Sequence, residues 1–232
     1  EHGQAEDWLG GGPYGGASHA QSSNLDIQHC SFSDNESGYL GGGVWFGSRR
    51  GCDAPEEGRR IVVMDSEFAE NHAAGGGGAV NINASRLHEE DTTSVQIERT
   101  SFNGNTSGSG GGAVRVYRSC CPPGPPWICP GECLPVSMDI ANCEFVGNES
   151  TDSHGGAASI NVYSDLDLTV SDTTFDANVA DSHGGAVHID HESSVSARFT
   201  DSTFVDNYSM AHGGVFYVYL HGGVFPVDDT LD

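Results

Sequence analysis

The feature of this sequence that most restricts its fold is a repeat present in six copies. Each copy contains a Phe-x-x-Asn motif, and a Gly-Gly pair begins six or seven residues after the Asn. The motifs are Phe32/Asn35, Phe68/Asn71, Phe102/Asn105, Phe145/Asn148, Phe175/Asn178 and Phe204/Asn207, and the pairs begin at Gly41, Gly77, Gly111, Gly155, Gly184 and Gly213. Such a period is typical of a solenoid, in which each repeat is one structural unit stacked on its neighbours.

Two short alternating apolar runs accompany the motifs. One run follows the Gly-Gly pair, as in Val80/Ile82, Val114/Val116, Val187/Ile189 and Phe216/Val218. The other lies seven and five residues before each Phe, at Leu25/Ile27, Ile61/Val63, Val95/Ile97, Met138/Ile140, Leu168/Val170 and Ala197/Phe199. Alternate side chains of a strand face opposite sides, so the apolar members point into one column that stacked coils bury. Parallel connections are right-handed. We predict an all-β, right-handed, single-stranded parallel β-helix of about six to seven coils.

The glycines and asparagines have predicted roles at the corners of this helix. Gly-Gly suits a corner where a Cβ would clash or where φ must be positive. Asn tolerates the left-handed region and can bond its equivalent in the next coil. We therefore expect an asparagine ladder formed by Asn35, Asn71, Asn105, Asn148, Asn178 and Asn207.

One domain, residues 1–232, accounts for the pattern, with repeats over about 15–218. The last two intervals between glycine pairs are equal and the shortest, and the excess length of earlier intervals falls at one corner. We expect insertions there, at about 47–60, 83–94 and 118–136, projecting from one edge of the helix. Residues 219–232 are expected to begin a further coil or a tail. Since the chain starts at Glu1 without an initiator Met, we also expect it to be part of a longer protein.

The charge balance excludes several classes of partner. The chain has 33 acidic residues, nine Arg and no Lys, for a net charge of −24. Nucleic acid and anionic membrane surfaces both need a basic patch, so we expect neither as a partner. No apolar run approaches the roughly 20 residues of a membrane span, so no membrane insertion is expected. We expect no cofactor, with Ca²⁺ kept as the alternative because the acidity suits Ca²⁺-containing surroundings.

Phe-x-x-Asn followed by Gly-Gly-Ala-Val resembles the repeat of the chlamydial polymorphic outer membrane proteins. The resemblance covers about residues 15–218. It implies a right-handed β-helix with a surface-exposed adhesive or structural role.

Three histidines, His154, His183 and His212, directly precede the glycine pairs of consecutive coils. They are expected to stack, with Asp152 and Asp181 two residues upstream of two of them. Imidazole and carboxylate are metal ligands, so a metal-binding or pH-responsive stripe is one interpretation. A linear stack with a spacing of about 4.8 Å does not converge on one ion, which favours a ladder in contact with solvent.

Two columns of residues are expected to face outward, and either one is a possible catalytic surface. The column after the glycine pairs is Trp45, Asn81, Arg115, Ser159, His188 and Tyr217, and the column before the Phe is Asp26, Val62, Gln96, Asp139, Thr169 and Arg198. Acid/base catalysis of polysaccharide cleavage needs carboxylates within reach of each other and of the substrate. Arg115 and His188 lie two coils apart in the first column, and Asp139 and Arg198 lie two coils apart in the second. No catalytic residues are therefore assigned.

Five sequons occur, at Asn35, Asn83, Asn105, Asn148 and Asn207. All except Asn83 are ladder asparagines, and an amide buried in a ladder is a poor glycan acceptor. Asn83 lies at a projecting insertion and is the preferred glycosylation site.

Seven cysteines indicate disulfides and an oxidising compartment. A Pro-rich loop contains four closely spaced cysteines, Cys120, Cys121, Cys129 and Cys133. Their spacing fits disulfide bonds better than a zinc site. Cys30 and Cys143 occupy the same repeat position three coils apart, too far apart to bond each other. We expect Cys30 to pair with Cys52, and Cys143 with a cysteine of the loop.

We predict an extracellular or cell-surface, non-enzymatic β-helix module that forms a rigid segment of an appendage, fibre or adhesin. Its expected partners are like subunits or neighbouring repeats, with glycans or surface proteins bound through the insertions. The alternative is a polysaccharide lyase or hydrolase built on the same scaffold.

Overall fold

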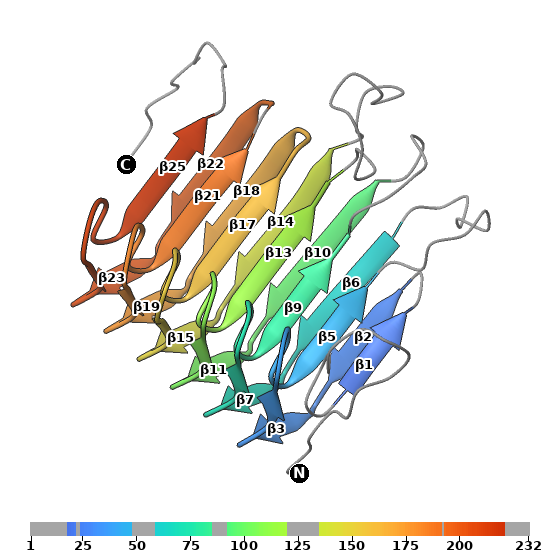
Figure 1. Cartoon of the computed structure of the whole chain (residues 1–232). Helices are drawn as coiled ribbons and strands as arrows, with labels where there is room; N and C mark the ends of the chain where they lie inside the picture. The colour runs from blue at the N-terminus through green and yellow to red at the C-terminus, as the bar shows by residue number, and fades with distance from the viewer. Residues whose placement is uncertain are drawn as a thin grey trace, which may run out of the picture.

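The computed structural model describes residues 18–21, 24–47, 59–84, 92–119, 135–191 and 193–220. Its strands form four parallel sheets that wrap around one axis, and the described residues contain no helix. The fold is the predicted right-handed parallel β-helix (Figure 1). The chain begins with the single strand β1, and six coils of four strands each follow it.

Each coil contributes one strand to each sheet, in the chain order II, III, IV and I. Sheet I follows the glycine pairs and contains β1 (Ser18–Gln21), β5 (Val44–Gly47), β9 (Val80–Asn83), β13 (Val114–Arg118), β17 (Ala158–Val162), β21 (Val187–His191) and β25 (Phe216–Leu220). Sheet II contains β2 (Leu25–Gln28), β6 (Arg59–Met64), β10 (Thr93–Glu98), β14 (Val136–Ala141), β18 (Leu166–Ser171) and β22 (Val195–Thr200).

The two shorter sheets carry the Phe-x-x-Asn motif. Sheet III contains β3 (Ser31–Ser33), β7 (Glu67–Ala69), β11 (Ser101–Asn103), β15 (Glu144–Val146), β19 (Thr174–Asp176) and β23 (Thr203–Val205). Sheet IV contains β4 (Glu36–Ser37), β8 (His72–Ala73), β12 (Thr106–Ser107), β16 (Glu149–Ser150), β20 (Val179–Ala180) and β24 (Tyr208–Ser209).

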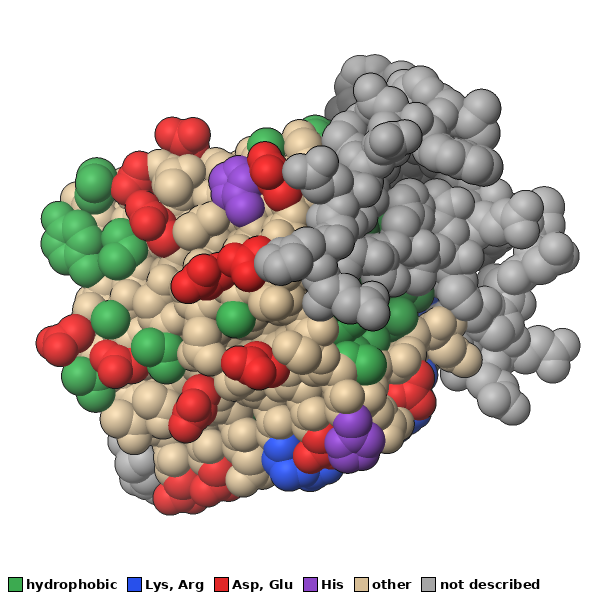
Figure 2. Space-filling view, turned by 90° about the horizontal axis from the view of Figure 1, so that it is seen from below, with side chains coloured by type: hydrophobic (Ala, Val, Ile, Leu, Met, Phe, Trp, Pro, Cys, Tyr) green, Lys and Arg blue, Asp and Glu red, His purple; other side chains and the backbone are tan. Residues whose placement is uncertain are grey.

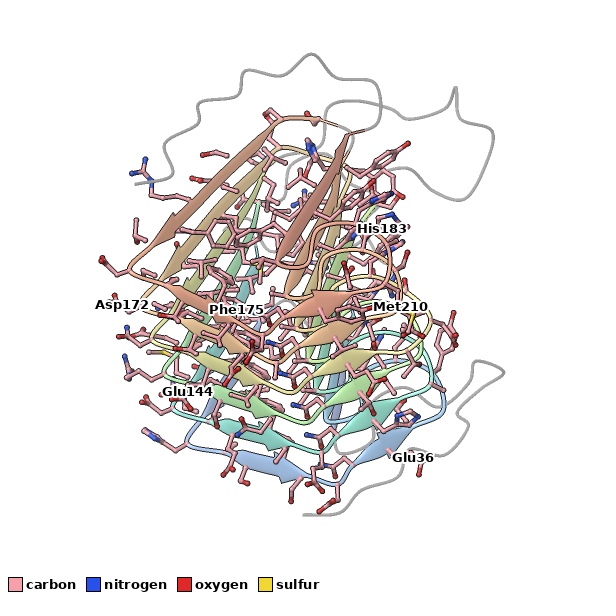
Figure 3. The ribbon with its side chains drawn as sticks, turned by 90° about the vertical axis from the view of Figure 1, so that its left-hand side faces the viewer. Glu36, Glu144, Asp172, Phe175, His183 and Met210 are labelled. Atoms are coloured by element: carbon pink, nitrogen blue, oxygen red, sulfur yellow. The ribbon has the colours of Figure 1, made fainter. Side chains whose placement is uncertain are left out.

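Equivalent residues of successive coils pair in register, so like side chains stack on like. The motif phenylalanines form a continuous stack with ring centroids 4.7–5.1 Å apart and planes within 9° of parallel. Phe68, Phe102, Phe145 and Phe175 are completely buried, and Figure 3 shows Phe175 inside the coil while Asp172 lies outside its corner. Burying each ring contributes about 1.5–3 kcal/mol, so the stack is a main source of stability.

The six motif asparagines form the predicted ladder. The Asn105 side chain shows the pattern: its Nδ2 donates to Oδ1 of Asn148 at 3.0 Å and to the carbonyl of Phe68 at 3.0 Å. Its backbone N–H donates to the same Asn148 oxygen. Equivalent bonds run from Asn35 to Asn207. Since a buried amide without partners is costly, the ladder binds each coil to the next in one register.

Both glycines of each pair are explained by the structure. The first, such as Gly184, has a positive φ of 66°. The second has no room for a side chain, because a Cβ on Gly156 would collide with the carbonyl oxygen of Gly185 in the next coil. The first glycine therefore sets the turn, and the second allows the coils to approach.

Two further corners of each coil also have left-handed backbone, which the sequence reasoning did not predict. One residue lies three positions before each Phe, and the column is His29, Asp65, Arg99, Asn142, Asp172 and Asp201. The other lies two positions after it, at Asp34, Glu70, Gly104, Gly147, Ala177 and Asp206. Asp and Asn are tolerant of this region, but the side chains vary so much that no motif marks these corners.

The expected insertions all connect sheet I to sheet II. Most of their residues, at 48–58, 85–91 and 120–134, lie outside the described part of the chain, as do 1–17, 22–23, 192 and 221–232. The last two coils make the same connection with short turns, such as the one between Val162 and Leu166. The coils therefore have the same arrangement of strands whether the connection from sheet I to sheet II is long or short.

Candidate functional site

Four of the six residues in the column that follows the glycine pairs are buried, contrary to the expectation for an outward-facing row, whereas Arg115 and Tyr217 are half-buried. Trp45, Asn81, Ser159 and His188 are each 7% exposed or less. The bends after sheet IV contribute to this burial: Asn81 Nδ2 donates to the Gly76 carbonyl at 3.3 Å, Gly110 lies against Ser159, and His154 stacks on His188. The sequence reasoning missed these bends because their residues have no common apolar pattern. The other column, from Asp26 to Arg198, is buried only at Val62.

The bend between sheets IV and I of one coil packs against a side chain of the sheet I strand in the next coil, so the contact runs diagonally between neighbouring coils. A Cβ on Gly76 would collide with the Arg115 side chain, and Gly110 lies against Ser159. In the later coils histidines take the place of these glycines. His154 and His183 lie in bends, whereas His188 and Tyr217 project from β21 and β25.

These rings form a cluster that we call the histidine corner, made of His154, His183, His188, His212 and Tyr217. His154 stacks on His188 with centroids 4.4 Å apart, and His183 lies 4.3 Å from Tyr217. The bend histidines also contact each other, at 4.9 Å for His154 and His183 and at 5.1 Å for His183 and His212. Figure 3 shows His183 on the outside of the coil. The predicted stack of bend histidines is present, and His188 and Tyr217 add to it.

The histidine corner favours the neutral forms of His154 and His188. The Nδ1 atoms of His154 and His183 lie 3.2 Å apart, a distance at which one of them donates a hydrogen bond to the other. Burial lowers the pKa of His188 to about 3, with the nearby His154 and His183 adding to the effect. Burial and then His183 lower the pKa of His154, while Asp190 opposes them. His188 Nδ1 is buried and has no hydrogen-bond partner. A proton on His188 would be a buried, uncompensated charge.

The metal interpretation of the histidine row gains no support from this geometry. Within the described residues, no group of three or more His, Cys, Asp or Glu side chains is arranged to hold a metal ion. Asp152 is exposed and Asp181 is half-buried, and neither takes part in the ring contacts. The imidazoles meet other rings rather than carboxylates, so the corner is a packed aromatic layer.

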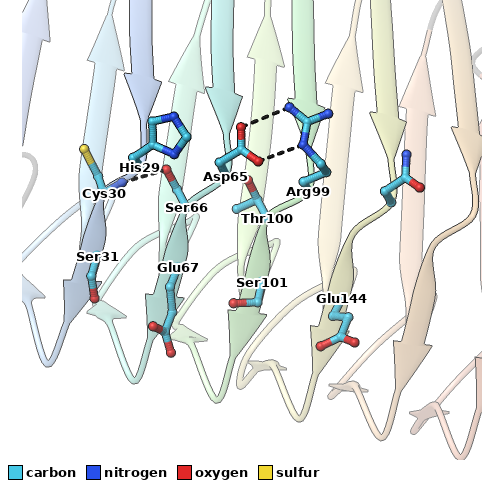
Figure 4. Close-up of a pocket in the computed structure, with 11 residues that line it drawn as sticks. His29, Cys30, Ser31, Asp65, Ser66, Glu67, Arg99, Thr100, Ser101 and Glu144 are labelled. Carbon is cyan, nitrogen blue, oxygen red and sulfur yellow. Dashed lines mark hydrogen bonds and ion pairs between the residues drawn. The ribbon is translucent and has the colours of Figure 1, made fainter.

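A groove of about 670 Å³ follows the corner between sheets II and III (Figure 4). Asp65 and Arg99, in neighbouring coils, form a two-point ion pair there, with nitrogen–oxygen distances of 2.7 and 2.9 Å. Arg99 also bonds to Glu98. Hydrogen bonds from Arg99 lower the pKa of the Asp65 carboxyl, which is therefore ionised at neutral pH and unsuited to act as a general acid.

Cys30 and Cys143 are free thiols, so the disulfides predicted for them are not formed in the structure. Each thiol takes the place of a corner hydroxyl. Cys143 Sγ donates to the Ala141 carbonyl at 3.2 Å, as Ser66 Oγ does to Met64 at 2.7 Å. Burial raises the pKa of Cys143 to about 11, which makes it unreactive. Cys52, Cys120, Cys121, Cys129 and Cys133 lie outside the described residues, and disulfides among them stay a prediction.

The ladder sequons are poor glycan acceptors for a physical reason. Nδ2 of Asn105 and of Asn148 is buried and donates two hydrogen bonds, so no space remains for a sugar. Asn35 belongs to the same ladder, and Asn207 is its half-buried last member. Asn83 ends β9 next to an insertion, and it stays the predicted site.

The comparisons with known proteins identify the repeat. The model of the Chlamydia polymorphic membrane protein repeat matches residues 99–116. The chain carries this repeat. The match runs from the Arg99 turn through β11 and β12 into β13, so one polymorphic membrane protein repeat corresponds to sheets III, IV and I of one coil. No match to the chain is found among the curated proteins, and none among the solved structures.

In the part of the chain that the structure describes, no helix is long and apolar enough to cross a membrane.

Proposed function

We propose that this chain is a non-enzymatic, surface-associated module of the adhesin type, which holds its insertions along one edge of a rigid rod outside the cell. The observation that carries the proposal is the position of the insertions. All three leave sheet I and return to sheet II, whereas the phenylalanine and asparagine ladders continue without interruption through the same coils. Variable loops on a fixed scaffold are a common arrangement for binding.

The repeat supports the surface assignment, because its family is that of polymorphic membrane proteins. The acidic surface supports it as well. Figure 2 shows acidic side chains scattered over the part of this face that the described residues form, and the net charge of −24 favours solubility over binding to nucleic acid. No geometry in the described residues favours the polysaccharide-cleaving alternative, since one candidate column is mostly buried and Asp65 in the groove is paired with Arg99.

The exposed face of the last coil is suited to stacking against a further coil. We propose that this partner coil belongs to the same protein or to another copy of it. Tyr208, Met210, Val218 and Tyr219 are each between 46% and 64% exposed there, and hydrophobic side chains gather at the left-hand end of Figure 2. Gly214 keeps the second position of its pair, although a Cβ at this residue would meet no atom of the described residues closer than 3.5 Å. A glycine at this position is needed when another coil stacks on it.

The adhesive role can be tested by shortening an insertion. Residues 119–135 would be replaced by the connection of the fifth coil, residues 163–165, which joins the same two sheets. The full chain and the shortened chain would be titrated onto cultured cells and a glycan array, with binding followed by fluorescence. We expect the full chain to bind saturably and the shortened chain, with an unchanged circular dichroism spectrum, to bind less. Equal binding by both, or none by the full chain, would contradict an adhesive role for this insertion.

Rod assembly needs its own measurement. Negative-stain electron microscopy with Ca²⁺ and then with a chelator should show rods joined end to end if the last coil is an interface. Isolated short rods at all protein concentrations would argue against it.

A further inference from the structure

Two arginines, Arg59 and Arg118, are buried at the corner between sheets I and II, which is the corner where the insertions begin. Arg59 is the first residue of β6, and the residues paired with it in successive strands are Thr93, Val136, Leu166 and Val195. Arg118 ends β13, where the next strand has Val162. Both side chains therefore lie in a layer that is mainly apolar in other coils.

Arg59 is the unusual member. It is 7% exposed, and its Nε and Nη1 atoms are buried without a hydrogen-bond partner. Among the described residues it forms no ion pair. A buried guanidinium without an anion costs several kcal/mol, and the protein has only nine basic residues in total. The placement of one of them here indicates that a negative charge belongs beside it.

Arg118 faces the same place. It is 2% exposed, and its Nη1 donates to Thr93 Oγ1 at 3.1 Å. Thr93 is the register partner of Arg59 in the next strand of sheet II, so the hydroxyl that accepts from Arg118 belongs to the residue stacked on Arg59. Burial lowers the pKa of each arginine to about 10, and Arg59 adds to the effect on Arg118, which is consistent with their closeness. Both remain cations at neutral pH.

We propose that Arg59, Arg118 and Thr93 bind a small tetrahedral oxoanion of the sulfate or phosphate class. A guanidinium offers a planar set of donors that matches two oxygens of such an anion, and the hydroxyl offers another donor. Such an oxoanion would supply the negative charge that Arg59 lacks among the described residues, and it has enough oxygens to accept from Arg118 and Thr93 as well. The site lies at the roots of the insertions flanking β6 and β13, so the anion would also fix where those insertions start. This inference does not depend on the adhesive function.

The test is thermal unfolding of the full chain at pH 7, in sodium sulfate and in sodium chloride of equal ionic strength. Sulfate stabilises many proteins by exclusion from their surface, so the comparison with variants decides the result. We expect a saturable, sulfate-specific rise in Tm, about 5–10 °C at a sulfate concentration a hundredfold above Kd. Arg59→Met should abolish this rise. Arg99→Gln, which removes an exposed arginine, should keep it.

The same variant gives a second readout in chloride alone. There Arg59→Met should be at least as stable as the natural chain, because it replaces an uncompensated charge by an apolar side chain of similar length. If sulfate has no specific effect and Arg59→Met is strongly destabilised in chloride, an internal carboxylate occupies the site and the proposal is wrong. Equal sulfate shifts in both proteins would also overturn it.

Two additional measurements apply if Arg59→Met does not fold. Thr93→Val keeps the side-chain shape and should raise the sulfate concentration at half-maximal stabilisation several-fold. Crystals grown with selenate should show an anomalous peak between the two guanidiniums. No peak there, with an unchanged midpoint for Thr93→Val, would exclude the site.

Discussion

The imidazole of His154 stacks on that of His188, with ring centroids 4.4 Å apart and planes inclined by 23°. The two residues are in different coils, one in a bend and the other in a strand. Their contact therefore joins the bend layer to the sheet beneath it. It also buries the His188 imidazole, so that a proton bound to this ring would be a charge without a hydrogen-bond acceptor at Nδ1.

This contact leads to a prediction for the dependence of stability on pH. The pKa of His188 in the folded state, about 3, lies below its ordinary value of 6.5, so between these values the unfolded chain binds more protons. The contribution of His188 to stability is complete above pH 6.5 and is lost as the pH falls towards 3, by about 3–5 kcal/mol in total. Urea unfolding from pH 7.5 to pH 4 should show this loss.

His188→Leu should reduce the slope of stability against pH in the same range. His29→Gln, which removes an exposed histidine of the groove, serves as the control for the loss of one imidazole, and its slope is compared with that of His188→Leu. Carboxylates titrate in all three proteins, so only the difference between curves is informative. Identical slopes for His188→Leu and the natural chain would refute the role assigned to His188.

The left-handed corners predict opposite effects for two substitutions at one repeat position. Ala177 has a φ of 52° and Gly147 a φ of 60°, and a Cβ on Gly147 would meet nothing within 4 Å. Ala177→Gly should stabilise the fold by about 0.5–1 kcal/mol, and Gly147→Ala should destabilise it by about 1 kcal/mol, because only the backbone strain differs. Urea midpoints measure both. Changes of the same sign would show that local packing, not φ, governs this corner.

The second glycine of each pair predicts a contrast between the interior and the end of the stack. A Cβ on Gly185 would collide with the carbonyl oxygen of Gly214, whereas Gly214 has no such neighbour. Gly185→Ala should cost at least about 3 kcal/mol, and Gly214→Ala less than about 1 kcal/mol when the chain is isolated. Chemical unfolding of the two variants gives the comparison. A large cost for Gly214→Ala would mean that another segment packs on the last coil in the isolated chain.

The ladder predicts which sequons are used when the chain is made in a glycosylating host. Peptide mass spectrometry should find a glycan at Asn83 and none at Asn105 or Asn148, because a sugar on either ladder amide would displace a bond such as that from Asn148 to Asn178. A fully occupied Asn105 in the folded protein would mean that the ladder is broken there.

The fold itself was predictable from the sequence. Phe102, Asn105 and the glycine pair at Gly111 recur at fixed offsets, and the apolar alternation before each Phe specifies which side faces inwards. Stacked coils apply the same local constraints six times, so a pattern too weak to interpret in one copy becomes decisive when repeated.

The candidate sites were less predictable, because they depend on contacts between coils. The coil period, the ladders and the corner that carries the insertions follow from local periodicity, so the amino-acid sequence was enough to establish them. The folded coils were needed to show that a bend covers His188, that the buried Cys143 thiol donates to the Ala141 carbonyl, and that Arg118 donates to Thr93, the register partner of Arg59. These contacts depend on how the bends, corners and strands pack in three dimensions, and the repeat pattern of the sequence does not specify that packing.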